Sequence, residues 1–167
     1  MNKDVRLRFA EQGDLQAIVE IYNQAIANKT TADMFPLKVS DRQQWLNDHH
    51  PDSHPVYVAE LDNKVVGWCS LSPYRPGRAA FRFTAEISYY VDYNFHGHKI
   101  GQALITHAIK DCKRLQLKNL FALILANNEK SVRFIAHHGF QKWGLMPNIA
   151  DFDGVETSHL IYGLRLK

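Results

Sequence analysis

The sequence predicts a single α/β domain, spanning residues 1–167, in which helices flank one mixed β-sheet. A chain of 167 residues with 46% hydrophobic content can bury one substantial core. Segments with strand periodicity alternate with segments of helix periodicity, as in α/β folds. No Pro/Gly/Ser-rich linker, internal repeat or low-complexity stretch interrupts this order. These three observations indicate one domain around one core.

The first segments are a strand and two helices. Residues 5–9 alternate between charged and apolar side chains and predict the strand. Gly13-Asp14 opens a helix, and Ser40-Asp41-Arg42-Gln43 has capping-box spacing for a second helix through Trp45 and Leu46. The first helix carries an apolar stripe for the core, which consists of Leu15, Ile18, Ile21, Tyr22, Ala25 and Ile26.

The middle of the chain is rich in strand signals. Residues 56–61 and 65–71 are β-rich runs on either side of the polar turn 62–64, and they predict a hairpin. Residues 73–77 contain proline and glycine and should interrupt strand pairing. A long strand is then predicted from about residue 82 to residue 91.

The last third supplies the remaining elements. Residues 120–125 form a continuous apolar run of strand length, which predicts a strand buried on both faces. Asn128 can cap the next helix, and Gly139 can occupy its C′ position. Residues 140–143 and 159–166 are predicted to close the sheet.

Residues 93–105 join the end of the long strand to the start of an amphipathic helix. Such a junction directs unpaired backbone N–H groups and the positive end of a helix dipole at one point in solvent. Gly97 and Gly101 let the backbone approach a ligand closely, which favours a phosphate group. Two glycines before a helix are also explained by a tight turn alone. Three side chains add donors to the loop: His96, His98 and Lys99.

Composition argues against several classes of function. A net charge of +3 with interspersed signs is a mild bias toward anionic ligands, and no basic stripe predicts a nucleic-acid partner. No apolar segment approaches the span of a bilayer and the first residues lack a signal-peptide pattern, so we expect a cytoplasmic protein with no membrane partner. The histidines lack the companion ligands of a metal motif, so no metal is expected. Cys69 and Cys112 should behave as small hydrophobes.

The second half of the chain resembles the GCN5-related N-acetyltransferase (GNAT) family. The resemblance rests on the strand before His96-Gly97-His98-Lys99-Ile100-Gly101, on Asn128-Glu129-Lys130-Ser131, and on the ending His138-Gly139-Phe140. In that family an R/Q-x-x-G-x-G/A loop wraps the pyrophosphate of acetyl-CoA, so the resemblance implies a mostly antiparallel sheet and acetyl-CoA as cosubstrate. His96 stands at the Arg/Gln position and Lys99 at the first motif glycine. If residue 99 needs a positive φ, lysine costs about 1 kcal/mol or more there.

Glu86 is the candidate general base. It is an isolated carboxylate within an apolar and aromatic strand, where partial desolvation would raise its pKa, although strand alternation equally allows a solvent-facing glutamate. The run Thr84–Val91 resembles the T-V-E-x-S-V-Y-V strand of the phosphinothricin and methionine-sulfoximine acetyltransferase branch, whose glutamate is the proposed base. The resemblance implies that backbone amides near Tyr90 and Val91 stabilise negative charge on the acetyl oxygen.

Further roles follow from the same resemblance. Asn128 and Ser131 match positions that bind the pantetheine arm, and Asn128 can equally be a helix cap. Ile135 replaces the tyrosine that usually serves as general acid, so we assign no general acid. The implied cofactor-binding residues are Tyr89, Tyr90, Val91, His96, Gly97, His98, Lys99, Ile100, Gly101, Gln102, Asn128 and Ser131.

The acceptor is expected to bind between two loops. Residues 74–81 resemble the aromatic-Arg-Pro loop of the branch, and a guanidinium in it can grip a carboxylate with two hydrogen bonds. Exposed loop arginines are otherwise simply solvated. His159 lies near a position that holds aspartate in the branch. The implied substrate-binding residues are Thr31, Phe35, Tyr74, Arg75, Arg78 and Glu86.

The sequence therefore predicts an acetyl-CoA-dependent N-acetyltransferase. The expected acceptor is a small amino-acid-like amine such as phosphinothricin, methionine sulfoximine or methionine sulfone, and the habit of the branch suggests a homodimer. Two alternatives stay open at this point. One is acetylation of a protein N-terminus or another amine, and the other is a noncatalytic acyl-CoA-binding regulatory module.

Overall fold

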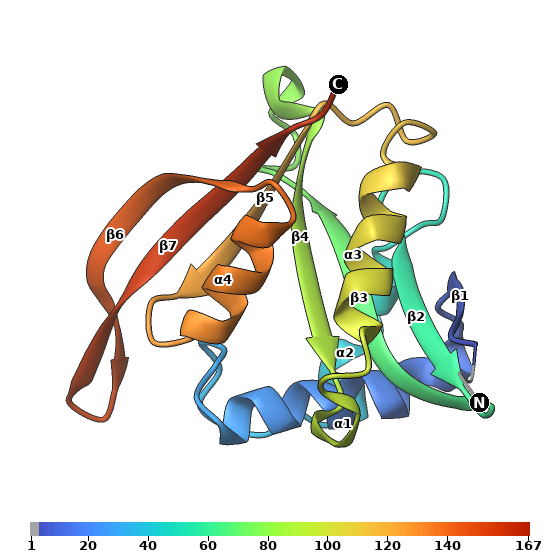
Figure 1. Cartoon of the computed structure of the whole chain (residues 1–167), viewed down its shortest axis with the longest axis horizontal. Coiled ribbons are helices and arrows are strands. Elements are labelled where there is room, and N and C mark those ends of the chain that lie inside the picture. Colours follow the sequence, from blue (N-terminus) through green and yellow to red (C-terminus); the bar gives the residue numbers. More distant parts are fainter. Residues whose placement is uncertain (1–3) are drawn as a thin grey trace.

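The computed structural model describes residues 4–167 and contains one seven-stranded sheet, in the order β1-β2-β3-β4-β5-β7-β6 (Figure 1). Every neighbouring pair is antiparallel except β4 and β5, which are parallel. The predicted mixed, mostly antiparallel sheet is therefore confirmed. The strands are β1 (Arg6–Phe9), β2 (Val56–Leu61), β3 (Lys64–Pro73), β4 (Thr84–Val91), β5 (Asn119–Leu125), β6 (Gln141–Phe152) and β7 (Val155–Arg165).

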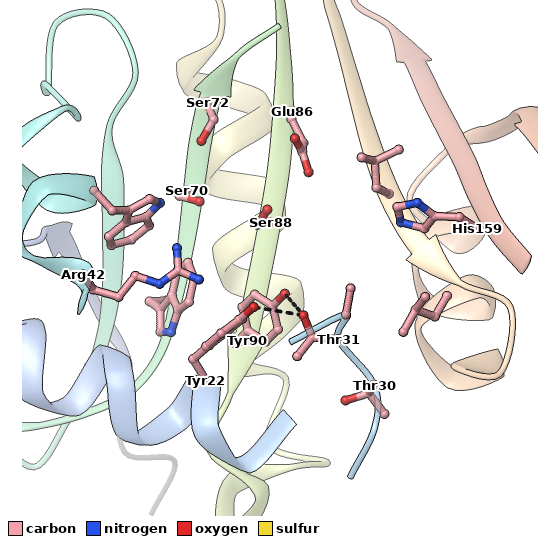
Figure 2. Close-up of a pocket in the computed structure, with 15 residues that line it drawn as sticks. Tyr22, Thr30, Thr31, Arg42, Ser70, Ser72, Glu86, Ser88, Tyr90 and His159 are labelled. Atoms are coloured by element: carbon pink, nitrogen blue, oxygen red, sulfur yellow. Dashed lines mark hydrogen bonds between the residues drawn. The ribbon is translucent and has the colours of Figure 1, made fainter. Parts of the chain in front are cut away.

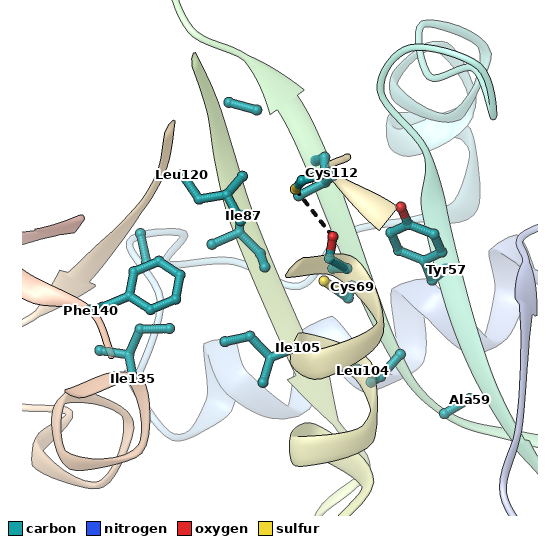
Figure 3. Packing of buried hydrophobic residues seen from close by; sticks show 14 of the residues in the cluster. Tyr57, Ala59, Cys69, Ile87, Leu104, Ile105, Cys112, Leu120, Ile135 and Phe140 are labelled. Atoms are coloured by element: carbon teal, nitrogen blue, oxygen red, sulfur yellow. Dashed lines mark hydrogen bonds between the residues drawn. The ribbon is translucent and has the colours of Figure 1, made fainter. Parts of the chain in front are cut away.

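Helices cover both faces of the sheet. The helices α1 (Leu15–Ala27) and α2 (Val39–Asn47) contribute to a core cluster with Trp68 of β3, while α3 (Ile100–Asp111) and α4 (Glu129–His137) pack on the other face. Figure 3 shows the larger cluster, in which Leu104 and Ile105 of α3 lie against the strands. Short 3-10 helices span Gln12–Asp14, Ala79–Phe81 and Tyr93–Phe95.

The parallel pair β4 and β5 is short, and this shapes the functional part of the molecule. The two strands are in register over only three positions, from Thr84↔Asn119 to Glu86↔Phe121. Beyond Glu86 they diverge, while β5 pairs with β7 along its whole length (Figure 1). The last five residues of β4 therefore face an opening in the sheet, which we call the split.

Several predicted details are confirmed. The hairpin turns at Asp62 and Asn63, which both have positive φ, as a tight two-residue turn requires. Asn128 caps α4, because its side chain accepts a hydrogen bond from the backbone N–H of Ser131. Gly139 follows that helix with a φ of 88°.

Other details differ from the sequence prediction. The second helix begins at Val39, one residue before Ser40, because the Asp41 carboxylate accepts a hydrogen bond from the N–H of Lys38 and caps the helix there. The strand over residues 120–125 is not buried on both faces, since Leu123 lies beyond the part of β5 that pairs with β4 and is 37% exposed. Both closing strands are longer than predicted because they pair with each other as a ribbon across a bulge between Met146 and Ala150.

Candidate active site

A cavity of about 310 Å³ opens where β4 leaves β5, on the face covered by α1 and α2 (Figure 2). Its walls come from both sides of the split, because residues of β3 and β4 face residues of β5 and β7. The lining residues are Tyr22, Thr30, Thr31, Ala32, Arg42, Trp45, Trp68, Ser70, Ser72, Glu86, Ser88, Tyr90, Leu123, Leu125 and His159.

Glu86 points into this cavity. Side chains alternate along β4, so Glu86, Ser88 and Tyr90 share the cavity face while Ile87 is buried in the opposite core. Desolvation by the surrounding protein raises the pKa of Glu86 above its usual value. The solvent-facing alternative for this glutamate is thus not what the structure shows. Glu86 lies where a base can reach an amine bound in the cavity.

A hydroxyl cluster lies at the end of the cavity next to α1. The Tyr22 hydroxyl lies 3.1 Å from the Thr31 Oγ1, which in turn lies 3.4 Å from the Tyr90 hydroxyl. Tyr22 also donates a hydrogen bond to the Asp33 carboxylate. Burial raises the pKa values of Tyr22 and Tyr90, so both phenols stay protonated at neutral pH. The predicted pocket residue Thr31 is therefore part of the lining.

Arg42 is a cavity residue that the sequence analysis did not identify. It comes from α2, and its guanidinium lies 4.8 Å from the centre of the Tyr22 ring and 5.5 Å from that of Trp45. Within residues 4–167 the carboxylate at ion-pair distance is Asp33, at 3.7 Å, which is longer than a hydrogen bond. The guanidinium N–H groups therefore remain available to a ligand (Figure 2). In sequence, Arg42 looks like any polar residue in a first helical turn.

His159 of β7 lines the far wall of the cavity, opposite Glu86 across the split (Figure 2). Burial lowers its pKa, so the ring is neutral at neutral pH. The sequence had marked this position only as a departure from the branch. Its place in the cavity depends on the pairing of His159 with Leu125, which only the folded sheet shows.

The structure does not bring four predicted substrate-binding residues to the cavity lining. Strand β3 runs to Pro73, so the loop after it starts beyond the end of the cavity. Tyr74 packs on Phe121 at a ring distance of 5.2 Å, while Arg75 and Arg78 are exposed. Phe35 is 78% exposed. The arginine that lines the cavity is Arg42 of α2, not Arg75 or Arg78 of the loop.

The predicted phosphate loop has the expected backbone geometry. The first intrahelical bond of α3 runs from the Ala103 N–H to the Lys99 carbonyl, so three N–H groups before it have no partner inside the helix. These belong to Ile100, Gly101 and Gln102. Gly97 has a φ of 83° and Lys99 a φ of 61°, so the lysine adopts the left-handed conformation that usually falls to glycine. The loop thus forms with lysine in place of the motif glycine.

His96 and Lys130 support this loop from the side. The His96 Nε2 lies 3.0 Å from the Val91 carbonyl oxygen, which can only accept, so Nε2 carries the proton. The Lys130 ammonium then donates to the His96 Nδ1 at 3.1 Å. Lys130 places a positive charge beside the loop, a feature that the sequence pattern did not predict. His98 is exposed in the same loop.

Beyond Glu86, the edge of β4 along the split has no partner strand among residues 4–167, so its backbone N–H groups face the opening. The Asp92 N–H donates to the Val66 carbonyl, and the Tyr74 N–H donates to the Thr84 carbonyl. In the β3–β4 register, these two bonds mean that the even-numbered residues of β4 direct their backbone N–H and C=O groups at β3. The N–H groups of Tyr89 and Val91 therefore point into the split, while that of Tyr90 points at β3. This alternation favours Tyr89 and Val91 over Tyr90 as backbone donors. Tyr90 contributes its side chain to the cavity instead.

The first turn of α4 completes the rim of the split. The Ser131 Oγ lies 2.6 Å from the Tyr89 hydroxyl, so β4 and α4 are linked across the core face. Asn128 is held as a helix cap. The predicted residues Tyr89, Asn128 and Ser131 are thus close together, beside the unpaired edge of β4.

These features fit coenzyme A. A helix N-terminus with unpaired N–H groups suits a pyrophosphate, and an exposed strand edge suits an amide-containing pantetheine arm. The split leads from this loop toward Glu86. Among residues 4–167, no three side chains are arranged to hold a metal ion. In the same range no helix has the length and apolar character needed to cross a bilayer.

Comparison with known proteins agrees with this geometry. Residues 15–140 match the model of the acetyltransferase (GNAT) family. A Bacillus subtilis protein named “Putative phosphinothricin acetyltransferase YwnH” is 40% identical over 162 residues, covering 96% of this chain and 98% of its own. The L-methionine sulfoximine/L-methionine sulfone acetyltransferase of Pseudomonas aeruginosa is 30% identical over 145 residues, covering 86% and 84%.

A solved structure extends the comparison to the ligand. The crystal structure of a GNAT superfamily phosphinothricin acetyltransferase from Sinorhizobium meliloti in complex with AcCoA has a TM-score of 0.90 and 26% identity, covering 97% of this chain and 88% of that one. The fold, the loop and the relatives agree on one assignment. The chain belongs to the GNAT family of acetyltransferases, in its phosphinothricin and methionine-sulfoximine acetyltransferase branch, and is an acetyl-CoA-dependent N-acetyltransferase.

Proposed function

We propose that the enzyme acetylates the amino group of a small amino-acid-like acceptor, of the phosphinothricin, methionine sulfoximine or methionine sulfone type, bound in the cavity at the split. The observation that carries the proposal is the position of Glu86 inside this cavity, at the point where β4 separates from β5. The cavity volume of about 310 Å³ suits a ligand of amino-acid size. We also infer a cytoplasmic location, on the sequence grounds given above.

The protein side of the reaction follows from the cavity. An amine with a pKa near 8 or above is mostly protonated at neutral pH, and Glu86 accepts that proton as the nitrogen attacks. Its raised pKa makes it a stronger base than an exposed glutamate. The backbone N–H groups of Tyr89 and Val91 point to the side on which the acetyl group is expected, where they can stabilise negative charge. Bound acetyl-CoA supplies the activated acetyl group.

Arg42 provides a site for the acid group of the acceptor. Its guanidinium is positioned by the Tyr22 and Trp45 rings and offers paired N–H donors to the cavity. An anionic group on Arg42 and an amine near Glu86 would give the acceptor one orientation. This arrangement favours a free amino acid over a neutral amine.

The test is a Glu86→Gln variant measured with acetyl-CoA and a panel of acceptors, with release of free thiol as the readout. We expect kcat to fall about 100-fold or more, with the KM for acetyl-CoA unchanged. Full activity of the variant would remove Glu86 from the mechanism. Faster turnover of an N-terminal peptide than of any amino acid in the panel would instead support the alternative acceptor class.

We also propose that the enzyme is a homodimer that pairs through the β6–β7 ribbon. Strand β6 is an edge of the sheet, and the ribbon exposes several large apolar side chains. Sedimentation should give twice the chain mass of 19.2 kDa, and Leu145→Glu should shift the enzyme toward the monomer. A monomeric wild type would reject this. The exposed apolar residues are Trp143, Leu145, Ile149 and Val155.

A further inference from the structure

His49 lies next to the cavity and contacts two of its lining residues, Trp45 and Ser72. It follows the C-terminus of α2, and it borders a second, smaller cavity of about 160 Å³. Its Nδ1 is 2.6 Å from the Trp45 carbonyl oxygen, and its Nε2 is 3.0 Å from the Ser72 Oγ. Ser72 lines the main cavity, so its hydroxyl is the polar side-chain group that links His49 to the acceptor site.

The hydrogen-bond partners determine where the protons lie in the neutral ring. A carbonyl oxygen can only accept, so the proton must be on the His49 Nδ1. The Nε2 then has only a lone pair, and the Ser72 hydroxyl must donate to it. The lone pairs of Ser72 are left facing the cavity, where the hydroxyl oxygen can accept but not donate.

Ser72 is also the cross-strand neighbour of Glu86. The two residues are paired in register between β3 and β4, and both side chains line the cavity (Figure 2). Among residues 4–167, no group donates a hydrogen bond to the Glu86 carboxylate. A hydroxyl donor from Ser72 would stabilise the carboxylate and weaken it as a base. The bond to His49 prevents this.

We infer that His49 holds the Ser72 hydroxyl so that its oxygen accepts a hydrogen bond from the amine of the acceptor, next to the Glu86 carboxylate. His49 is thus a positioning residue, and Ser72 is a further substrate-binding residue. The inference rests on the proposed function, because it needs an amine acceptor in this cavity. The reaction makes and breaks no covalent bond to His49 or Ser72.

Protonation of His49 would reverse this arrangement. The charged ring has two N–H donors, so its Nε2 would donate to Ser72 and release the Ser72 hydroxyl toward Glu86. Burial, which is the largest effect, and Arg42 disfavour the charged ring, whereas the hydrogen bond to the Trp45 carbonyl and the charge of Asp48 favour it. His54 also lies close enough to interact with His49, and Glu86 faces the ring through Ser72. Because burial lowers the pKa of His49, the neutral arrangement holds at neutral pH.

The first test needs no substrate. In ¹⁵N-histidine-labelled enzyme at pH 8, the nitrogen chemical shifts of His49 should show the neutral ring with its proton on Nδ1. In Ser72→Ala the same tautomer should persist, because the Trp45 carbonyl still accepts. A proton on Nε2, or a charged ring at pH 8, would overturn the inference.

The second test is kinetic, with acetyl-CoA and L-methionine sulfone as the acceptor. Ser72→Ala should raise the KM for the acceptor about tenfold, the size of one hydrogen bond to a charged group, and leave the KM for acetyl-CoA unchanged. His49→Phe, which keeps a ring against Trp45, should do the same. The double variant should be no worse than either single variant, because both remove one interaction. His49→Gln, whose amide oxygen can accept from Ser72, should fall between His49→Phe and the wild type.

The matched control is His50→Gln. His50 is the exposed neighbour on the second cavity, so the KM values should not change in this variant. Additive effects of His49→Phe and Ser72→Ala, or equal changes in both KM values, would show a general structural role and reject the inference. If wild type prefers another amine in the panel, the variants are measured with that amine. Loss of turnover in Glu86→Gln with a normal Ser72→Ala would keep the proposed function and reject only this inference.

Discussion

The two ends of the active site differ in the groups that face the ligand: backbone groups at the nucleotide end, which is the loop before α3, and side chains at the acceptor end, which is the cavity at the split. The loop at residues 96–101 uses backbone N–H groups at the start of α3, while the side chains of His98 and Lys99 are exposed and that of His96 supports the loop from the side. The acceptor cavity uses side chains from α1, α2, β3, β4, β5 and β7. A backbone site tolerates changes of residue, as His96 and Lys99 show, because the donors do not depend on the side chain. In the acceptor cavity the side chains are themselves the binding groups, so substitutions there should weaken acceptor binding.

The strongest test of this contrast is Arg42→Met in the acceptor cavity. Loss of a paired guanidinium contact should raise the KM for an amino-acid acceptor about 100-fold and leave the KM for acetyl-CoA unchanged. Arg42→Lys keeps the positive charge but not the paired N–H donors of the guanidinium, so its acceptor KM should lie between those of wild type and Arg42→Met. Steady-state kinetics with each substrate varied in turn gives both values. An unchanged acceptor KM would show that the acid group binds elsewhere.

The next prediction concerns pH. Only ionised Glu86 is a base, so kcat/KM for the acceptor should fall about tenfold per pH unit below the pKa of this residue. Because burial raises that pKa, the fall should begin above the usual range of a glutamate. A pH profile of the wild type beside Glu86→Gln checks this. If the residual activity of Glu86→Gln fell at low pH in the same way, the acid limb of the pH profile would belong to another group.

The same carboxylate should affect stability with a defined sign. The pKa of Glu86 is higher in the folded enzyme than in the unfolded chain, so the folded state binds the proton more tightly. The free energy of unfolding should therefore fall as pH rises from the unfolded pKa through the folded one. Glu86→Gln should remove this loss, so that urea unfolding at pH 8 needs more denaturant than for wild type. Greater stability of the wild type would contradict the buried position of this carboxylate.

A smaller effect is expected at Lys99 of the nucleotide loop. Lysine at a φ of 61° is strained, so Lys99→Gly should raise the free energy of unfolding by about 1 kcal/mol. The backbone N–H groups are unchanged in Lys99→Gly, so its affinity for coenzyme A should change little. The change should be smaller than the change in acceptor KM in the variants of the acceptor cavity. Thermal unfolding and calorimetry provide the two measurements. A large loss of affinity would mean that the Lys99 ammonium, and not the backbone, carries the phosphate contact.

The smallest effect is expected at Lys130, whose ammonium is an exposed charge beside the loop. Lys130→Met should weaken coenzyme A binding by about threefold at low salt and less at high salt, as expected for a screened interaction. Exposed Arg133, on the same helix, is the matched control, and Arg133→Met should have a smaller effect. A loss that does not depend on salt would mean that Lys130 acts through His96.

The local structure of the loop before α3 and of the start of α4 could be predicted because its signals are local. Glycine spacing, the start of an amphipathic helix and the N-cap at Asn128 are all contained in short segments. Glu86 was also identified, because a carboxylate stands out in an apolar strand. The residues of the loop at 74–81 were assigned by resemblance, and the structure leaves them outside the cavity lining. Arg42, Ser72 and His49 had no local signal at all.

By itself, the sequence determined the α/β class and most element positions, since periodicity and turn residues act through near neighbours. The reaction type followed from the resemblance of its motifs to the GNAT family. Only the tertiary structure decided which side chains meet at the split. That meeting depends on where β4 leaves β5 and on how α2 packs against β3, and both involve residues far apart in the chain. Long-range packing of this kind leaves no periodic trace in the sequence, because each contributing residue satisfies only its own local pattern.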